Sequence, residues 1–384
     1  MKKVLYVCYL QNYFRGLTQR THHLINFMAN QEDIGSLDVI HINNSNEKID
    51  IVKKHIGKIT FYGINTLPAI PWGLNHLVSP LKVFISFLKN NKMKYDYIVA
   101  ESPWGGLVAI LLKLFGKTKI VIYEDMDFFP GFYTKSKIRN IIVKFLEWLV
   151  IKNADLVISV GNELANIRRR ITKKEVYVSP NGVFYDKFAR ALQKQEHPPT
   201  LIYMGNIEEW AGVDLPIRAL PRLLEKIPNL RYMVVGDGPF LEKIKQLSEE
   251  LGVADHVDFV GLQPYDNLPN YLSKADIGIA TYLPIDLMKY AFTLKVVEYG
   301  AAGLPVIATK IGETTKYISK NRTGILINRN EDEFYEAVIK LFENKQLYHE
   351  LSTNGTKKAK LMDWDIILKK RYTMIDDFLK SYIK

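Results

Sequence analysis

The strongest constraint on the fold is an alternation between short apolar runs and longer amphipathic stretches. The apolar runs have the length of buried strands, and the stretches between them space their apolar residues three or four positions apart, as helices do. Strands that alternate with helices form parallel sheets covered by helices on both faces. The alternation runs through twice in 384 residues, so we predict an α/β protein of two doubly wound, Rossmann-like domains.

The first domain is expected over residues 1–190. Its predicted strands are 3–10, 38–43, 59–62, 95–100, 119–123, 155–160 and 175–179, with helices at 18–29 and 105–114. A turn signal, Pro180-Asn181-Gly182, follows the last strand, and the polar passage after it, which ends Gln195-Glu196-His197-Pro198-Pro199, is typical of a linker.

The second domain is expected over residues 198–363. Its predicted strands are 200–204, 232–235, 257–260, 277–281, 305–308 and 324–327, with helices at 215–226, 240–251 and 331–342. A last amphipathic helix, 364–384, lies beyond this sheet. Open α/β sheets bind ligands at the carboxyl ends of their strands, so we expect the two domains to face a ligand across a cleft.

Composition excludes several classes of protein. The single cysteine, Cys8, rules out a disulfide framework and a thiolate metal cluster, and it fits a reducing cytoplasm. The eight histidines show no metal-ligand pairing, so we expect no metal and no other cofactor. No uncharged apolar stretch is long enough to span a membrane. We therefore expect a cytoplasmic protein.

The positive charge is confined to the first half. Residues 1–190 hold 27 Lys and Arg against 15 Asp and Glu, whereas the remainder hold 25 against 26. Stretches 77–94 and 135–152 combine lysines with apolar and aromatic residues, as helices at a bilayer interface do. We expect an anionic membrane surface as a partner, with ordinary core faces and a general lysine bias as the alternative. No nucleic-acid-binding module is present, so no nucleic acid is expected.

Residues 290–309, YAFTLKVVEYGAAGLPVIAT, are the most informative segment. They predict a loop, a short helix from near Thr293, a stop at Gly303 and a buried strand. Amide groups at the start of such a helix favour a phosphate, and Lys295 adds a full positive charge. Glu298, one turn further, can accept hydrogen bonds from a ribose diol. A capping threonine followed by a solvent-facing lysine and glutamate is the alternative.

The glycine turn at 236–239 is not a dinucleotide fingerprint, because a proline follows its second glycine and the third glycine is missing. Together with 290–309 it belongs to a set of five segments, the others being Ser179-Pro180-Asn181-Gly182-Val183, Tyr203-Met204-Gly205-Asn206 and Ala275-Asp276-Ile277. In this order and spacing the set resembles the retaining glycosyltransferase family four, or glycosyl transferases group 1, over most of the chain. The resemblance implies the GT-B fold, with an acceptor-binding first domain, a nucleotide-sugar-binding second domain and a C-terminal helix crossing back.

The resemblance also implies roles for individual residues. Glu298 would hold the nucleotide ribose, the amides of Thr293 and Leu294 would meet the sugar and phosphate, and Lys295 would stabilise the leaving group. The remaining donor-binding residues implied are Gly16, Arg15, Gly205, Asn206 and Phe292.

Two departures from the family pattern concern the donor site. Tyr290 stands where relatives have a first glutamate that contacts the transferred sugar. No cation is present at Asn206 or near Trp210, where relatives carry an arginine and a lysine. Either Lys295 and Arg15 compensate for these charges or activity is lost.

Carboxylates past two strands of the first domain are further candidates. Asp125 aligns with a family histidine that meets the sugar near the reacting carbon, and Asp127 follows it as a second candidate catalytic group. Glu101 and Asn12 are expected on the acceptor side, with a solvated loop acid as the alternative for Glu101. Their spacing does not establish the opposed carboxylates of a glycosidase.

The sequence thus predicts a metal-independent, retaining hexosyltransferase that uses a nucleoside-diphosphate sugar. The expected acceptor is a hydroxyl of a lipid-linked or cell-surface glycan, as in polysaccharide biosynthesis, at the inner face of the membrane. The alternatives are transfer to a soluble acceptor and a catalytically weak GT-B binding or partner subunit.

Overall fold

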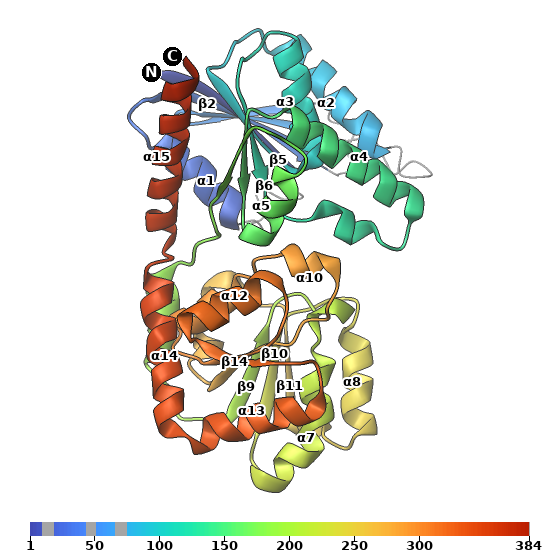
Figure 1. Ribbon diagram of the computed structural model, residues 1–384, viewed down its shortest axis with the longest axis vertical. Helices are drawn as coiled ribbons and strands as arrows, with labels where there is room; N and C mark the ends of the chain where they lie inside the picture. Colours follow the sequence, from blue (N-terminus) through green and yellow to red (C-terminus); the bar gives the residue numbers. More distant parts are fainter. Residues whose placement is uncertain (10–18, 44–50, 66–74, 384) are drawn as a thin grey trace. The chain divides into compact units, whose positions relative to one another are not determined.

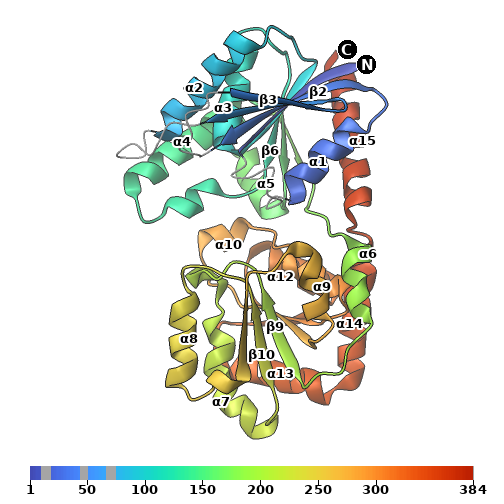
Figure 2. The same cartoon turned by 180° about the vertical axis from the view of Figure 1, so that it is seen from behind.

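The computed structural model describes residues 1–9, 19–43, 51–65 and 75–383, which divide into two compact units (Figures 1 and 2). Unit 1 consists of Met1–Pro180 together with Lys370–Lys384, and unit 2 consists of Asn181–Lys369. Each unit contains one open, almost entirely parallel sheet with helices on both faces. The predicted α/β class with two Rossmann-like domains is therefore confirmed.

The sheet of unit 1 has the strand order β3-β4-β2-β1-β5-β6-β7-β8 and is parallel except for the edge strand β3. Its strands are β1 (Lys2–Tyr9), β2 (Ile34–Asn43), β3 (Ile51–Ile56), β4 (Ile59–Asn65), β5 (Tyr97–Glu101), β6 (Val121–Asp125), β7 (Leu156–Ser159) and β8 (Glu175–Val178). Strand β3 was not predicted, because Lys53, Lys54 and His55 interrupt its apolar pattern. Charged side chains of this kind protect an exposed sheet edge from further pairing.

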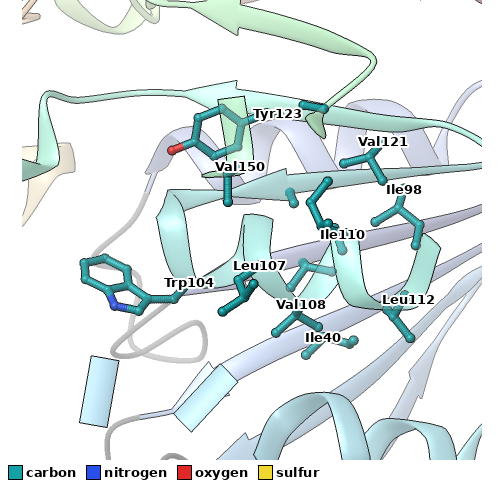
Figure 3. Close-up of a cluster of buried hydrophobic side chains, with 14 of the residues drawn as sticks. Ile40, Ile98, Trp104, Leu107, Val108, Ile110, Leu112, Val121, Tyr123 and Val150 are labelled. Carbon is teal, nitrogen blue, oxygen red and sulfur yellow. The ribbon is translucent and has the colours of Figure 1, made fainter. Parts of the chain in front are cut away.

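Helices cover both faces of this sheet. They are α1 (Gln19–Ala29), α2 (Asn75–Asn90), α3 (Ser102–Leu114), α4 (Lys137–Asn153), α5 (Asn162–Arg169) and the end of α15 (Trp364–Ile383). Leu5 and Val7 of β1 pack with α2, α3 and α4, whereas Val4 and Tyr6 point to the other face and pack with α1 and α15. Figure 3 shows the first of these cores, with Leu107 of α3 among its side chains.

Unit 2 has a fully parallel sheet in the order β11-β10-β9-β12-β13-β14. Its strands are β9 (Thr200–Met204), β10 (Arg231–Val235), β11 (Val257–Gly261), β12 (Ile277–Ala280), β13 (Val306–Thr309) and β14 (Gly324–Ile327). Its helices are α6 (Tyr185–Phe188), α7 (Asp214–Lys226), α8 (Leu241–Glu250), α9 (Leu268–Leu272), α10 (Asp286–Tyr290), α11 (Lys295–Ala301), α12 (Gly312–Asn321), α13 (Glu331–Glu343) and α14 (Lys345–Lys360). Helices α7, α8 and α13 cover one face, and α11, α12 and α14 cover the other.

The chain enters unit 2 earlier than the sequence pattern suggested. Val183, Phe188 and Ala191 are buried in the core of unit 2, so residues before the expected linker already belong to it. The polar passage is also anchored, because the Lys194 ammonium donates to the carbonyls of Leu272 and Ala275. Helix α15 begins in unit 2, and its residues from Lys370 onward belong to unit 1. None of the helices in the described part of the chain is long and apolar enough to span a membrane.

Candidate functional site

Two glycine turns lie at the carboxyl end of the unit 2 sheet. Gly205 follows β9 and Gly236 follows β10, with φ of 133° and 145°. A Cβ on Gly236 would lie 1.9 Å from the carbonyl oxygen of Gly205, so only glycine permits this backbone contact. Residues Gly205 and Asn206 are exposed, which leaves the loop open to a ligand.

Helix α11 carries two charged side chains near these turns. Lys295 and Glu298 are three residues apart and therefore share one face of the helix. The opposite side of α11 packs closely against α14, where a Cβ on Gly300 would lie 3.0 Å from the carbonyl oxygen of Gly355. This close helix packing fixes the position of Lys295 and Glu298.

The Lys295 ammonium sits in an aromatic cage. Its Nζ lies 4.0 Å from the ring centre of Tyr203 and 5.3 Å from that of Tyr282, distances at which cation–π attraction operates. A Cβ on Gly205 would lie 2.9 Å from this Nζ, so the ammonium directly borders the glycine loop. Burial lowers the pKa of Lys295 to about 7, and the Glu298 carboxylate opposes the shift. An anion in the loop would restore the charged form.

Glu298 is 5% exposed, and its Oε1 accepts a hydrogen bond of 2.7 Å from the Tyr265 hydroxyl. Burial raises the pKa of Glu298 to about 7, while Tyr265 and Lys295 oppose the shift. The pair therefore combines an ammonium, which attracts anions, with a carboxylate, which accepts hydrogen bonds. A ligand with an anionic group near Lys295 and hydroxyls near Glu298 would favour the charged form of each side chain.

The other donor-site candidates of unit 2 lie nearby. Thr293 lies two residues before the start of α11, and its hydroxyl lies 3.3 Å from that of Thr314. The ring of Phe292 contacts Tyr317. Leu294 is the residue before α11, so the helix begins two residues later than predicted. Trp210 packs against both hydrophobic cores of unit 2, and its ring contacts that of Tyr282. It stands near the position where relatives carry a lysine, and its side chain has no charge.

In unit 1 the structure corrects the expectation for Asp125. This carboxylate is 0% exposed and accepts hydrogen bonds of 2.9 Å from both Nε and Nη2 of Arg168, and one from Ser159. Arg168 also binds Glu147 through two further hydrogen bonds. Both oxygens of Asp125 are held inside this buried network, so the carboxylate does not face a sugar. Its removal would cost about 3–5 kcal/mol of stability, because the buried charge of Arg168 would lose a partner.

Glu101 is likewise interior, 1% exposed and bonded by the hydroxyls of Tyr6 and Thr21, which removes it from the acceptor side. Asp127 differs from both, because its side chain is only half-buried. Burial raises the pKa of Asp127 to about 7, with Arg20 opposing the shift and Asp125 adding to it. Asp127 is therefore the carboxylate of this region that remains a candidate for contact with substrate.

Three expected site residues, Asn12, Arg15 and Gly16, lie outside the described residues. Within the described ranges, no three His, Cys, Asp or Glu side chains gather as a metal site. Sequence reasoning missed Tyr265 and Tyr282 as neighbours of the charged pair. The sequence offers one indication of their role: each tyrosine follows closely on the carboxyl end of a predicted strand, where ligands of parallel sheets bind.

The two parallel-sheet units have the architecture of the GT-B fold, and comparison with known proteins adds a match within unit 2. Residues 184–358 match the family model described as glycosyl transferases group 1. This match covers most of unit 2, and it confirms the resemblance that the motifs of that unit carry.

Two of the individual relatives share less than 30% sequence identity with the chain. The chain is 28% identical to the GDP-mannose-dependent α-(1-6)-phosphatidylinositol monomannoside mannosyltransferase of Mycobacterium tuberculosis over 219 residues, which are 53% of this chain and 55% of that protein. It is 27% identical to the phosphatidylinositol N-acetylglucosaminyltransferase gpi3 subunit of Schizosaccharomyces pombe over 205 residues, which are 52% of this chain and 43% of that protein. The chain thus spans about half the length of these relatives.

The fold matches solved structures over nearly the whole chain. Sucrose-phosphate synthase from Thermosynechococcus elongatus superposes with a TM-score of 0.81 at 19% identity, covering 99% of this chain and 100% of that one. HepE of Anabaena, solved in complex with UDP-glucose, gives a TM-score of 0.72 at 17% identity, covering 98% and 100%. These similarities establish the fold.

Proposed function

We propose that this chain is a retaining glycosyltransferase that moves a hexose from a nucleoside-diphosphate sugar to an acceptor hydroxyl, without a metal. The observation that carries the proposal is the pairing of Lys295 and Glu298 on one face of α11, beside the open loop at Gly205. An ammonium suits a diphosphate, and a carboxylate suits the two hydroxyls of a ribose. The UDP-glucose bound by HepE, which shares the fold, supports this choice of donor.

The proposed reaction is the same-face displacement that the resemblance to family four implies. The bond between the anomeric carbon and the diphosphate oxygen breaks, and its electron pair leaves on the phosphate. The acceptor oxygen forms its bond to the anomeric carbon on the same face of the sugar, and its proton passes to the departing phosphate oxygen. Lys295 stabilises the negative charge that develops there. The Asp127 carboxylate would accept a hydrogen bond from a sugar hydroxyl or stabilise electrostatically the positive charge that develops on the sugar ring.

We propose that the acceptor is a lipid-linked or cell-surface glycan and that the protein works as a peripheral protein on an anionic membrane. The names of the mannosyltransferase and N-acetylglucosaminyltransferase relatives both specify phosphatidylinositol lipids. Transfer to a soluble acceptor is the nearest alternative.

The surface of unit 1 supports a membrane partner. Helices α2 and α4 lie on the same face of the sheet (Figure 1). Both expose apolar side chains, namely Val78, Leu81 and Ile85 of α2 and Ile138, Ile141, Phe145 and Trp148 of α4. The lysines beside them include Lys89, Lys144 and Lys152. Glu147 is the one carboxylate on either helix, and it is buried against Arg168. The two helices therefore present apolar and cationic groups with no exposed negative charge.

A catalytically weak nucleotide-sugar-binding subunit is the second candidate, and it is favoured by two charged groups that the site lacks. Tyr290 ends α10 where a carboxylate was expected, and the loop at Asn206 and Trp210 supplies no cation. One ammonium would then carry the charge stabilisation expected of several groups.

Turnover separates the two candidates. The protein is incubated with UDP-, GDP- and ADP-hexoses, and release of nucleoside diphosphate and the anomeric configuration of the product are followed by NMR. We expect slow hydrolysis with retention, and a loss of about a hundredfold in Asp127→Asn, with donor binding kept. The control Asp377→Asn changes an exposed carboxylate of unit 1 and should have no effect. Donor binding without any release would favour the non-catalytic subunit.

A further inference from the structure

Tyr265 contacts Glu298, the candidate ribose-binding carboxylate, and lies outside the five segments that resemble the family. It opens the short 3-10 helix Tyr265–Asn267, which follows strand β11. Its hydroxyl donates to Oε1 of Glu298 at 2.7 Å. Among the described residues, no side chain or amide donates to the second oxygen, Oε2. Glu298 therefore has one oxygen held by the protein and one left for a ligand.

The ring of Tyr265 is itself fixed by its surroundings. Phe188, 0% exposed, meets it edge-on at 5.4 Å, and Phe184 does so at 6.1 Å. The ammonium of Lys187 lies 5.2 Å from the ring centre and also pairs with Asp266, the next residue. Contacts on the ring edge and face leave the hydroxyl little freedom to turn away from Glu298.

We propose that Tyr265 is a positioning residue that aims the free oxygen of Glu298 at the ribose hydroxyls of a nucleoside diphosphate. The inference rests on the proposed function, because it assigns the ligand of the same site. A carboxylate anchored through one oxygen keeps the other in a fixed direction, so less rotational freedom is lost when the diol binds. The hydrogen bond also favours the ionised carboxylate, which accepts from hydroxyls more strongly than the neutral acid does.

Packing alone would not require the hydroxyl, because phenylalanine would fill the same space between Phe184 and Phe188. The test therefore removes the hydroxyl and keeps the ring, in the variant Tyr265→Phe. Tyr348→Phe is the matched control, since it removes a hydroxyl that donates 2.9 Å to the carbonyl oxygen of Asp276 in the same unit. Both variants and the wild type are titrated calorimetrically with UDP, GDP and ADP, and then with the 2′-deoxy and 3′-deoxy forms of the nucleotide that binds.

We expect the wild type to prefer the ribonucleotide over a deoxy form, and Tyr265→Phe to weaken ribonucleotide binding by about tenfold while leaving deoxynucleotide binding unchanged. Because both affinities are measured on one preparation, partial unfolding cancels from their ratio. In Glu298→Ala the preference disappears, and adding Tyr265→Phe to it produces no further loss. Tyr348→Phe keeps the wild-type ratio.

Three results would overturn parts of this proposal separately. An unchanged ratio in Tyr265→Phe, or equal weakening of both nucleotide forms, would refute the role of Tyr265 alone. A wild type that binds ribo- and deoxynucleotides equally would refute the ribose role of Glu298 and with it that of Tyr265. A wild type that binds no nucleotide would refute the proposed function itself.

Discussion

Burial displaces the pKa values of Lys295 and Glu298 in opposite directions, to about 7 in each case. Near neutrality each group is therefore only partly charged, although a diphosphate and a ribose require both charges. A ligand that supplies the missing partners would pull the pKa of Lys295 up and that of Glu298 down. Binding should then take up a proton at Lys295 and release one from Glu298.

This linkage predicts a maximum in donor affinity near pH 7. Above it the Lys295 ammonium loses its proton, and below it the Glu298 carboxylate gains one, so affinity falls on both sides, by at most about tenfold per pH unit. Calorimetry with a nucleotide sugar from pH 5.5 to 9 measures this, because its diphosphate diester does not titrate in that range. Lys295→Arg keeps its charge and should flatten the alkaline side alone. Affinity independent of pH would contradict the proposed ionisation of the pair.

The sequence predicted the pair itself but not its surroundings. Lys295 and Glu298 could be predicted because their helix spacing and flanking motif are local. The buried position of Asp125 could not be predicted. It depends on which arginine of the run Arg168-Arg169-Arg170 points inward from α5, and this is decided by tertiary packing rather than by local sequence. Tyr265 was missed for the same reason, since 33 residues separate it from Glu298.

At the level of elements, periodicity predicted the strands of both units apart from β3, and boundaries shifted by a few residues. Helices α2 and α4 were expected from the spacing of their apolar residues, but periodicity cannot tell a buried face from an exposed one. The structure shows that both helices bury one apolar face and expose further apolar residues, such as Ile141 at 65% and Phe145 at 52%. Exposed apolar area of this kind marks an interaction surface.

If this surface meets a membrane, the wild type should sediment with vesicles containing phosphatidylglycerol and remain in solution with pure phosphatidylcholine. The double variant Ile141→Asp with Phe145→Asp should lose at least about tenfold in vesicle affinity, because it places two anions on the apolar face. Leu361→Asp changes an equally exposed apolar residue of unit 2, 62% exposed, and should bind as the wild type does. Equal binding of all three proteins, or no preference for anionic vesicles, would count against the membrane surface.

Across the whole molecule the two units differ in what they share with relatives. The group 1 family match covers residues 184–358, within unit 2, whereas the similarity of fold to solved structures extends over 97–99% of the chain. In unit 1, the fold is what the solved structures show. Its core is completed by α15, whose Ile375 and Phe378 are buried there and whose Arg371 pairs with Glu124.

The most direct test of the proposed donor site is calorimetric titration of the full chain with UDP, GDP, ADP and their hexose derivatives, with and without magnesium. We expect one nucleotide family to bind without magnesium, and Glu298→Ala and Lys295→Ala each to weaken it by about tenfold or more. The control Glu250→Ala, at an exposed position of unit 2, should bind normally. Absence of binding by every nucleotide, or unchanged binding in both site variants, would contradict the assignment of this site.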